Sequence, residues 1–164
     1  MIKIIDDILN QNELLFLNDL CRDFKKTNTN ELDGVNNFYN SMFIDDYSEL
    51  SRFKDEILKI VSDLDCEYDL NNPGIFINKV DTTTNQNDGY HRDGSHLTFI
   101  VYLNHDFEGG GFEYIQDGEL HQITPRPNLT IFMDNTVLHR VLPVVRGERY
   151  SLITWLFLKN KKLV

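Results

Sequence analysis

After residue 70 the sequence becomes a series of short strand-like runs, and this series limits most strongly which folds the chain can adopt. The runs are rich in β-branched and aromatic residues and are separated by turn residues. They cover residues 74–80, 97–103, 112–116, 119–123, 129–134, 139–144 and 149–158. Asp117 and Gly118, between two of these runs, are typical of a two-residue hairpin turn. Many closely spaced strands predict an antiparallel barrel or a double-sheet sandwich.

Two amphipathic helices are predicted before the strands. Residues 10–25 and about 47–65 carry apolar side chains at three- and four-residue steps. Asn10 with Glu13 resembles a capping box at the start of the first helix, and we expect Asp46 with Glu49 to cap the second. The sequence therefore predicts an α+β, mainly β, fold with the N-terminal helices packed against one sheet.

The length of 164 residues suits one domain. We expect a helical part over about residues 1–70 and a barrel core over about residues 74–158. No apolar run approaches the ~20 residues of a membrane-spanning helix, so no membrane contact is expected. Cys21 and Cys66 do not have the spacing of a metal site, and we expect reduced thiols and a cytoplasmic location. The oligomeric state is left open.

The charge of the chain argues against nucleic acid as a partner. The formal net charge is −10, and nearly all of the excess negative charge falls in residues 1–82. An acidic protein without a basic stripe repels a phosphate backbone. The expected reading of the acidic half is a solvated helical surface.

The stretch GYHRDGSH, residues 89–96, places two potential metal ligands two positions apart. In an extended chain such residues point to the same side, so His91 and Asp93 can reach one ion while Arg92 points away. His139, at the start of a later strand, can complete the set. Two imidazoles and one carboxylate are typical of non-haem Fe(II) oxygenases. Three other histidines have no such pattern and are not expected to bind metal: His96, His105 and His121.

The last strand-like run places a cation, a hydroxyl group and an aromatic ring on one face. By period-two alternation this face carries Arg149, Ser151, Ile153 and Trp155. A buried arginine needs a carboxylate partner, preferably a bidentate one. The face therefore predicts an anion site that a dicarboxylate ligand can occupy.

Four segments between residues 74 and 158 carry a more specific pattern. In order they read YHRD, FIVYLN, GGGFEYI and LTIFMDNTVLHRVLPVVRGERYSLITWLF. In this order and spacing they resemble the prolyl-4-hydroxylase-like group of Fe(II)- and 2-oxoglutarate-dependent oxygenases. The resemblance implies a double-stranded β-helix, or jelly-roll, barrel. It also implies Fe(II), 2-oxoglutarate and O2 as reactants of the site, with ascorbate as the reductant.

The resemblance assigns roles residue by residue. His91, Asp93 and His139 would hold the iron, and Arg149 would pair with the distal carboxylate of 2-oxoglutarate. Two further side chains would help to bind this carboxylate, namely Ser151 and Tyr102. The pocket would be lined by Ile100, Val141, Ile153 and Trp155. Residues 109–111, a run of three glycines, would allow a tight turn where side chains obstruct.

Three side chains next to the metal ligands are candidate substrate contacts: Tyr90, Arg92 and Arg140. Residues 82–90 and 28–45 are candidate loops at the barrel mouth, and we expect them to be the least ordered parts of the protein without substrate. The strand before the site lacks the aromatic residue that many relatives carry, which leaves the substrate open.

The implied activity is a dioxygenase that couples 2-oxoglutarate decarboxylation to hydroxylation of a C–H bond. A peptidyl residue, as in the prolyl-4-hydroxylase-like enzymes, is the expected substrate. The same chemistry on a free amino acid or another small molecule is the alternative. A third reading is a barrel that serves only as a binding module, and an intact metal triad with Arg149 argues against it.

Overall fold

The computed structural model describes residues 1–23, 41–64, 66–83 and 89–159. Its helical segments are α1 (Gln11–Arg22), the 3₁₀ turn η1 (Ser48–Leu50) and α2 (Ser51–Val61). Its first strands are β1 (Ile2–Asp6), β2 (Ser41–Phe43), β3 (Tyr68–Asp81), β4 (Leu97–Tyr102) and β5 (Glu108–Gly109). The remaining strands are β6 (Phe112–Gln116), β7 (Glu119–Ile123), β8 (Leu129–Asp134), β9 (Leu138–Val141), β10 (Val144–Arg146) and β11 (Glu148–Leu158).

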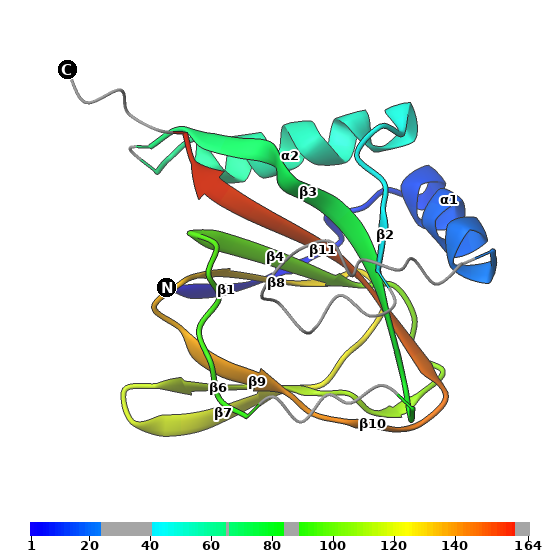
Figure 1. Ribbon diagram of the computed structural model, residues 1–164, viewed down its shortest axis with the longest axis vertical. Coiled ribbons are helices and arrows are strands. Elements are labelled where there is room, and N and C mark those ends of the chain that lie inside the picture. Colours follow the sequence, from blue (N-terminus) through cyan, green and yellow to red (C-terminus); the bar gives the residue numbers. More distant parts are fainter. Residues whose placement is uncertain (24–40, 65, 84–88, 160–164) are drawn as a thin grey trace.

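The strands form two facing layers, with the helices outside one of them (Figure 1). The major sheet has the order β1-β8-β4-β11-β3-β2, and all its pairs are antiparallel. The opposite layer contains the three-stranded sheet β7-β6-β9 and the β10-β5 pair. This arrangement confirms the predicted mainly β fold of two antiparallel sheets with helices packed against one sheet. Neither helix of the described chain is long and apolar enough to cross a membrane.

Two hydrophobic cores lie on the two sides of the major sheet. Alternation along β4 sends Phe99 and Val101 toward the helices, where they join Phe53 and Ile57 of α2. The intervening residues of β4 point between the two sheets and pack with residues of β6 and β8; this inner core contains Ile100, Tyr102, Phe112, Leu129, Ile131, Met133 and Val137. The centre of the major sheet is therefore buried on both faces, and it encloses polar side chains such as Asn78, Thr98 and Ser151.

The first helix begins as predicted, while the second begins differently. Asn10 Oδ1 accepts a hydrogen bond from the Glu13 amide at 2.9 Å, and Glu13 returns one to the Asn10 amide, which confirms the capping box. The cap predicted for Asp46 with Glu49 is wrong. Here η1 leads directly into α2, and backbone hydrogen bonds that span three residues occupy amide groups at the start of the helix. Neither segment has a side-chain cap.

Two strand assignments also need correction. Residues 2–6 form β1, an edge strand paired with β8, so the N-terminal part supplies strands as well as helices. The run 139–144, predicted as one strand, is divided between β9 and β10. Pro143 lies at the division, and proline has no amide hydrogen to continue a ladder. The predicted hairpin between β6 and β7 is confirmed, because Asp117 and Gly118 both have positive φ, as a type I′ turn requires.

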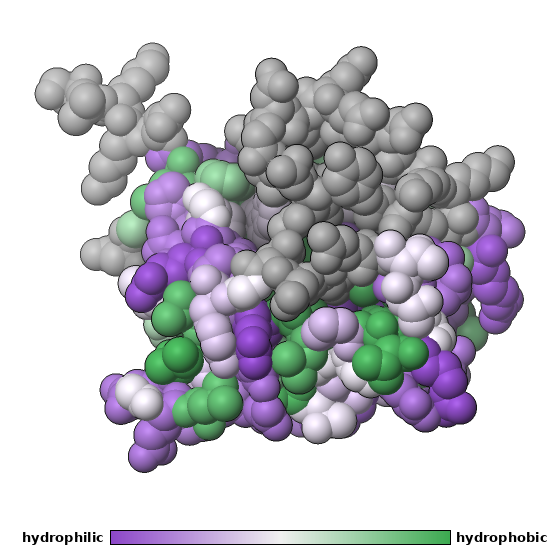
Figure 2. Space-filling model, turned by 60° about the horizontal axis from the view of Figure 1, so that its bottom comes forward, coloured by the Kyte–Doolittle hydropathy of each residue, from purple (hydrophilic) through white to green (hydrophobic). Residues whose placement is uncertain are grey.

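The outer layer exposes several hydrophobic side chains without forming one continuous apolar area among the described residues. Ile115, Leu120 and Val145 are among the exposed ones, and they belong to β6, β7 and β10. Figure 2 shows this side of the molecule, with hydrophobic areas separated by hydrophilic side chains. Isolated surface hydrophobics of this kind are ordinary in soluble proteins.

Asn128 links the N-terminal segment to the start of β8. Its side chain donates to the Leu9 carbonyl oxygen at 2.7 Å and accepts from the Leu9 amide at 3.0 Å. Asn128 is buried and has a φ of 63°, a left-handed conformation that asparagine tolerates better than other side chains. One residue thus satisfies two buried backbone groups and makes the turn.

We predict that Asn128→Ala lowers the free energy of unfolding by about 3 kcal/mol. The Leu9 amide and carbonyl groups lose their hydrogen-bond partner, and alanine is strained in the left-handed conformation. Asn128→Gly removes the strain and should cost only about 2 kcal/mol. Urea unfolding at constant m-value measures both. Asp117→Gly, at an exposed positive-φ position, is the control. A wild-type stability for Asn128→Gly would show that the amide contacts with Leu9 contribute nothing.

Candidate active site

Three potential metal ligands from two distant segments meet between the sheets. His139 lies on β9, and its backbone exchanges two hydrogen bonds with His91, at 2.8 and 2.9 Å. Asp93 lies two residues after His91 in the sequence. Its Oδ1 lies 3.8 Å from His91 Nε2 and 3.6 Å from His139 Nε2. The potential ligand atoms of the three residues all lie within 4.8 Å of one another. No other such group of three occurs among the described residues.

Backbone contacts turn both imidazoles so that Nε2 faces the centre of the group. His91 Nδ1 lies 3.2 Å from the Gly89 carbonyl oxygen, and His139 Nδ1 lies 3.2 Å from that of Val137. A carbonyl can only accept, so each Nδ1 carries the proton and each Nε2 offers a lone pair. Burial lowers the pKa of His139, against the opposing effect of Asp93. A lowered pKa keeps this imidazole neutral, as metal binding requires.

The carboxylate of Asp93 is oriented by a hydroxyl chain. Thr98 Oγ1 donates to Asp93 Oδ2 at 2.5 Å, and Ser95 Oγ lies 2.9 Å from the same Thr98 oxygen. This contact uses Oδ2 and leaves Oδ1 directed at the two imidazoles. Thr98 and Ser95 are both buried, so the chain is shielded from water. Neither residue was assigned this role from the sequence, although Ser95 and Thr98 follow Asp93 by two and five positions, which is a signal for such a role.

A buried cation lies deeper between the sheets, on β11. Arg149 is 5% exposed, and its Nη1 donates to the Gly110 carbonyl oxygen at 3.0 Å. Burial lowers the pKa of Arg149, and the nearby Tyr102 hydroxyl opposes that effect. A guanidinium starts from so high a pKa that it stays charged. Burial raises the pKa of Tyr102 to about 12, so its hydroxyl remains a donor at neutral pH.

The three glycines of residues 109–111 make room for this cation. Gly109 and Gly110 both have positive φ. A Cβ on Gly110 would lie 3.3 Å from Arg149 Cδ and 3.0 Å from the Phe107 ring, while one on Gly109 would lie 2.3 Å from the Pro143 carbonyl oxygen. The predicted tight turn is present, and it lets the backbone of Gly110 approach the guanidinium closely.

A row of buried polar residues crosses the inner face of the major sheet beside Arg149. Ser151 of β11 lies opposite Tyr102 of β4 on one side and opposite Asn78 of β3 on the other. Asn78 in turn donates to Ser41 of β2 at 3.3 Å. The sequence analysis missed Asn78 and Ser41; the only signal was a single asparagine inside an apolar strand. Ser151 Oγ is buried without a hydrogen-bond partner among the described residues.

This orphaned hydroxyl tests whether the pocket fits a carboxylate ligand. A buried hydroxyl without a partner is costly, and ligands commonly complete such groups. Ser151, Tyr102 and Arg149 together provide donors and positive charge, which suits one end of a dicarboxylate. The residues present therefore fit both groups that the sequence predicts, an iron at the triad and a dicarboxylate at Arg149.

The residues predicted to line the pocket belong to β4, β9 and β11. Ile100 belongs to the inner core, and Val141 packs against it. Ile153 lies opposite Ile100 in the register of β11 with β4. Trp155 lies opposite Thr98, and its ring meets that of Phe76 edge to face at 5.5 Å. The ring of His139 stacks on Phe112 at 5.1 Å, so apolar surface supports the metal side as well.

The three predicted substrate contacts make contacts with other parts of the protein. Tyr90 and Arg140 meet on the outer face of the three-stranded sheet β7-β6-β9, where the Arg140 guanidinium lies 4.6 Å from the centre of the Tyr90 ring. The contact of Tyr90 and Arg140 with substrate stays a prediction. Arg92 donates to the Thr136 carbonyl oxygen at 3.1 Å near the surface, and its contact with substrate stays a prediction. The predicted mouth loops, residues 28–45 and 82–90, lie largely outside the described residues.

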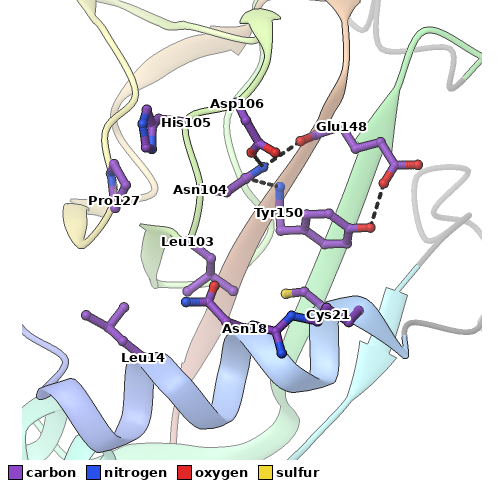
Figure 3. A pocket seen from close by; sticks show the side chains of 11 residues that line it. Leu14, Asn18, Cys21, Leu103, Asn104, His105, Asp106, Pro127, Glu148 and Tyr150 are labelled. Carbon is purple, nitrogen blue, oxygen red and sulfur yellow. Dashed lines mark hydrogen bonds between the residues drawn. The ribbon is translucent and has the colours of Figure 1, made fainter.

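A separate pocket lies on the helix side of the major sheet (Figure 3). It has a volume of about 650 Å³ and opens between α1 and the ends of β4 and β11. His105 contributes to it, and burial raises the pKa of the Cys21 thiol there to about 12. No member of the metal triad lines this pocket, and the major sheet separates the two places. His96 and His121 also lie outside the triad.

Comparison with known proteins places the chain in a family. Residues 71–157, just over half of the sequence, match the 2OG-Fe(II) oxygenase superfamily. The chain belongs to this superfamily. It is accordingly a 2-oxoglutarate-dependent Fe(II) dioxygenase, and the matched region contains the triad and Arg149. No curated protein sequence matches the chain.

Solved structures of prolyl hydroxylases share the fold over nearly the whole chain. The viral collagen prolyl hydroxylase of Paramecium Bursaria Chlorella virus-1 is 16% identical with a TM-score of 0.70, covering 98% of this chain and 90% of that one. A prolyl-4-hydroxylase from Pseudomonas putida is 19% identical with a TM-score of 0.68, covering 97% and 93%. A Trichoplax adhaerens prolyl hydroxylase in complex with a hypoxia inducible factor peptide fragment is 16% identical with a TM-score of 0.63, covering 95% and 83%. At these identities the likeness establishes the fold.

We predict that Thr98→Val weakens the binding of Fe(II), or of Mn(II) as its redox-inert substitute, by about tenfold. The reason is that Asp93 loses the contact that orients its carboxylate. Isothermal titration of the metal-free protein measures this. Thr154→Val is the matched control, because the Thr154 hydroxyl is buried without a partner among the described residues. Equal affinities of the Thr98→Val and Thr154→Val variants would contradict the role of Thr98.

Proposed function

We propose that this dioxygenase hydroxylates a residue within a peptide, as the prolyl-4-hydroxylases do, and that it couples this reaction to decarboxylation of 2-oxoglutarate. The observation that carries the proposal is the arrangement of the site. The triad of His91, Asp93 and His139 lies on one side of the barrel interior, and the donors of Arg149, Ser151 and Tyr102 lie on the other.

The access to the triad supports a peptide substrate. The His91 side chain is 38% exposed, while those of Asp93 and His139 are 13% and 3% exposed. The metal would therefore be reached from the His91 side, and an open approach of this kind admits part of a longer chain. Several solved structures with the same fold are prolyl hydroxylases, and one of them is a complex with a peptide fragment.

Each polar group of the site has a separate task in the proposed reaction. O2 is the oxidant of the proposed reaction, and bound iron with 2-oxoglutarate would activate it, which is chemistry that no protein side chain supplies. His91, Asp93 and His139 would hold the iron as its three protein ligands. Arg149 would fix the distal carboxylate of 2-oxoglutarate, with Tyr102 and Ser151 donating to the same group. The apolar walls formed by Ile100 and Ile153 would exclude water.

We predict that the protein reconstituted anaerobically with Fe(II) forms succinate from 2-oxoglutarate once O2 is admitted. Asp93→Ala should abolish this turnover because the iron loses its only carboxylate ligand. A panel of proline-containing peptides and free amino acids is tested for stimulation, with and without ascorbate, and mass spectrometry detects gain of one oxygen atom. Hydroxylation of a free amino acid alone would favour the small-molecule alternative. A folded protein that binds neither iron nor 2-oxoglutarate would leave only a binding module.

We predict that Ser151→Ala raises KM for 2-oxoglutarate by about tenfold with a smaller effect on kcat, because one hydrogen bond to the distal carboxylate is lost. Arg149→Ala should raise KM for 2-oxoglutarate by more than about 100-fold, because a charged bidentate contact with the carboxylate is stronger than the single hydrogen bond of Ser151. The measurement is succinate formation at varied 2-oxoglutarate. Thr154→Val, on the other face of β11, should leave KM unchanged. An unaltered KM in Ser151→Ala would place the carboxylate elsewhere.

A further inference from the structure

Two of the three metal ligands lie on a segment that the sheets hold only weakly. His91 makes an isolated bridge with His139, and none of residues 92–96 belongs to a strand. Asp93 is connected onward through Thr98, whereas His91 is joined to β9 by the two backbone hydrogen bonds of the bridge, and its Nδ1 contacts the Gly89 carbonyl oxygen of its own segment. A ligand site loses affinity when its members are not held in place. Some further contact must therefore fix His91 against β9.

Glu113 of β6 provides such a contact because its carboxylate accepts hydrogen bonds from three segments. Its Oε2 accepts from the Tyr90 hydroxyl at 3.0 Å and from Arg140 Nε at 2.6 Å. Its Oε1 accepts from Gln122 Nε2 at 2.5 Å. Glu113 is only 3% exposed, so its charge is held almost entirely by these partners. Hydrogen bonds from Arg140, Gln122 and Tyr90 hold the pKa of Glu113 below its usual range, with Arg140 contributing most.

The positions of these partners connect the contact to the metal. Tyr90 directly precedes His91, and Arg140 directly follows His139. Glu113 lies opposite Arg140, and Tyr114 lies opposite His139, in the register of β6 with β9. Neighbouring strand residues point to opposite faces, so Glu113 and Arg140 lie on the outer face directly behind His139. The Arg140 guanidinium also covers the Tyr90 ring, which gives the segment a second hold.

We propose that Tyr90, Arg140 and Glu113 form a clamp that positions His91 against His139 and thereby sets the metal affinity of the site. The clamp does not include a metal ligand; it acts through the two ligands that adjoin Tyr90 and Arg140 in sequence. The inference rests on the metal site of the family and is independent of which substrate is hydroxylated.

The test is a Mn(II) titration of the metal-free full-length protein, followed by the electron paramagnetic resonance signal of free Mn(II). Tyr90→Ala removes both the hydroxyl and the ring, and should weaken Mn(II) binding by about tenfold. Tyr90→Phe keeps the ring under Arg140 and should lose only about threefold. Co(II) absorption of the same variants reports the geometry of the ligands, and its visible bands should change in Tyr90→Ala.

Two further variants separate positioning from general stability. Tyr150→Phe removes a similar hydrogen bond, from a tyrosine hydroxyl to Glu148 at 2.8 Å, on the helix side of the major sheet. It should leave Mn(II) affinity unchanged. Glu113→Gln keeps an acceptor for Tyr90 but loses the charge, and combining it with Tyr90→Phe should give less than the sum of the two effects. Thermal unfolding without metal confirms that each variant is folded.

The outcomes are distinct. Weakened metal binding in folded Tyr90→Ala, with wild-type binding in Tyr150→Phe, supports the clamp. Wild-type Mn(II) affinity and Co(II) spectrum in Tyr90→Ala overturn it, whatever happens to stability, and do so even if Glu113→Gln fails to fold. Neither result depends on hydroxylation, so peptide turnover can fail while the clamp stands. A wild-type protein that binds no Mn(II) overturns the clamp and the proposed function together.

Discussion

The two-faced packing of strand β11 is the constraint on which the rest of the structure depends. It pairs with β4 on one side and β3 on the other, so its register fixes the centre of the major sheet. Leu152 and Leu156 point into the helix-side core, while Arg149 and Ser151 point between the sheets. A shift of one residue would bury the cation among the helices and expose the leucines to the polar interior. The hydrophobic core on one side therefore holds the functional side chains on the other.

The metal triad depends on a second pairing, between the segment of His91 and strand β9. This pairing is short, and the structure supports it from both sides. Thr98 orients Asp93 from the major sheet, and the outer-face contacts of Tyr90 and Arg140 with Glu113 lie behind His139. The three ligands come from an irregular segment and a short strand, which alone do not fix the positions of the ligand atoms. Neighbouring side chains such as Thr98 and Glu113 therefore hold them in place.

Sequence reasoning recovered a large part of this arrangement and failed at identifiable places. The alternation in residues 149–158 predicted the inward face correctly, since period two follows from strand geometry alone. It failed at β1, whose few residues read as the approach to a helix, and at the start of α2, where backbone contacts replace a side-chain cap. It did not anticipate the contact of Arg140 with the Tyr90 ring, because adjacency to a metal ligand in sequence does not show which side chain from another segment lies beside it.

The sequence by itself determined the strand and helix content, the spacing of His91, Asp93 and His139, and the cation of the last strand, because residue type and local periodicity encode these features. Only the tertiary structure decided which side chains support them. Asn78 beside Ser151 and Glu113 behind His139 are contacts set by cross-strand register and by the folding of the two sheets. Register depends on the packing of both cores at once, and no short stretch of sequence contains that information.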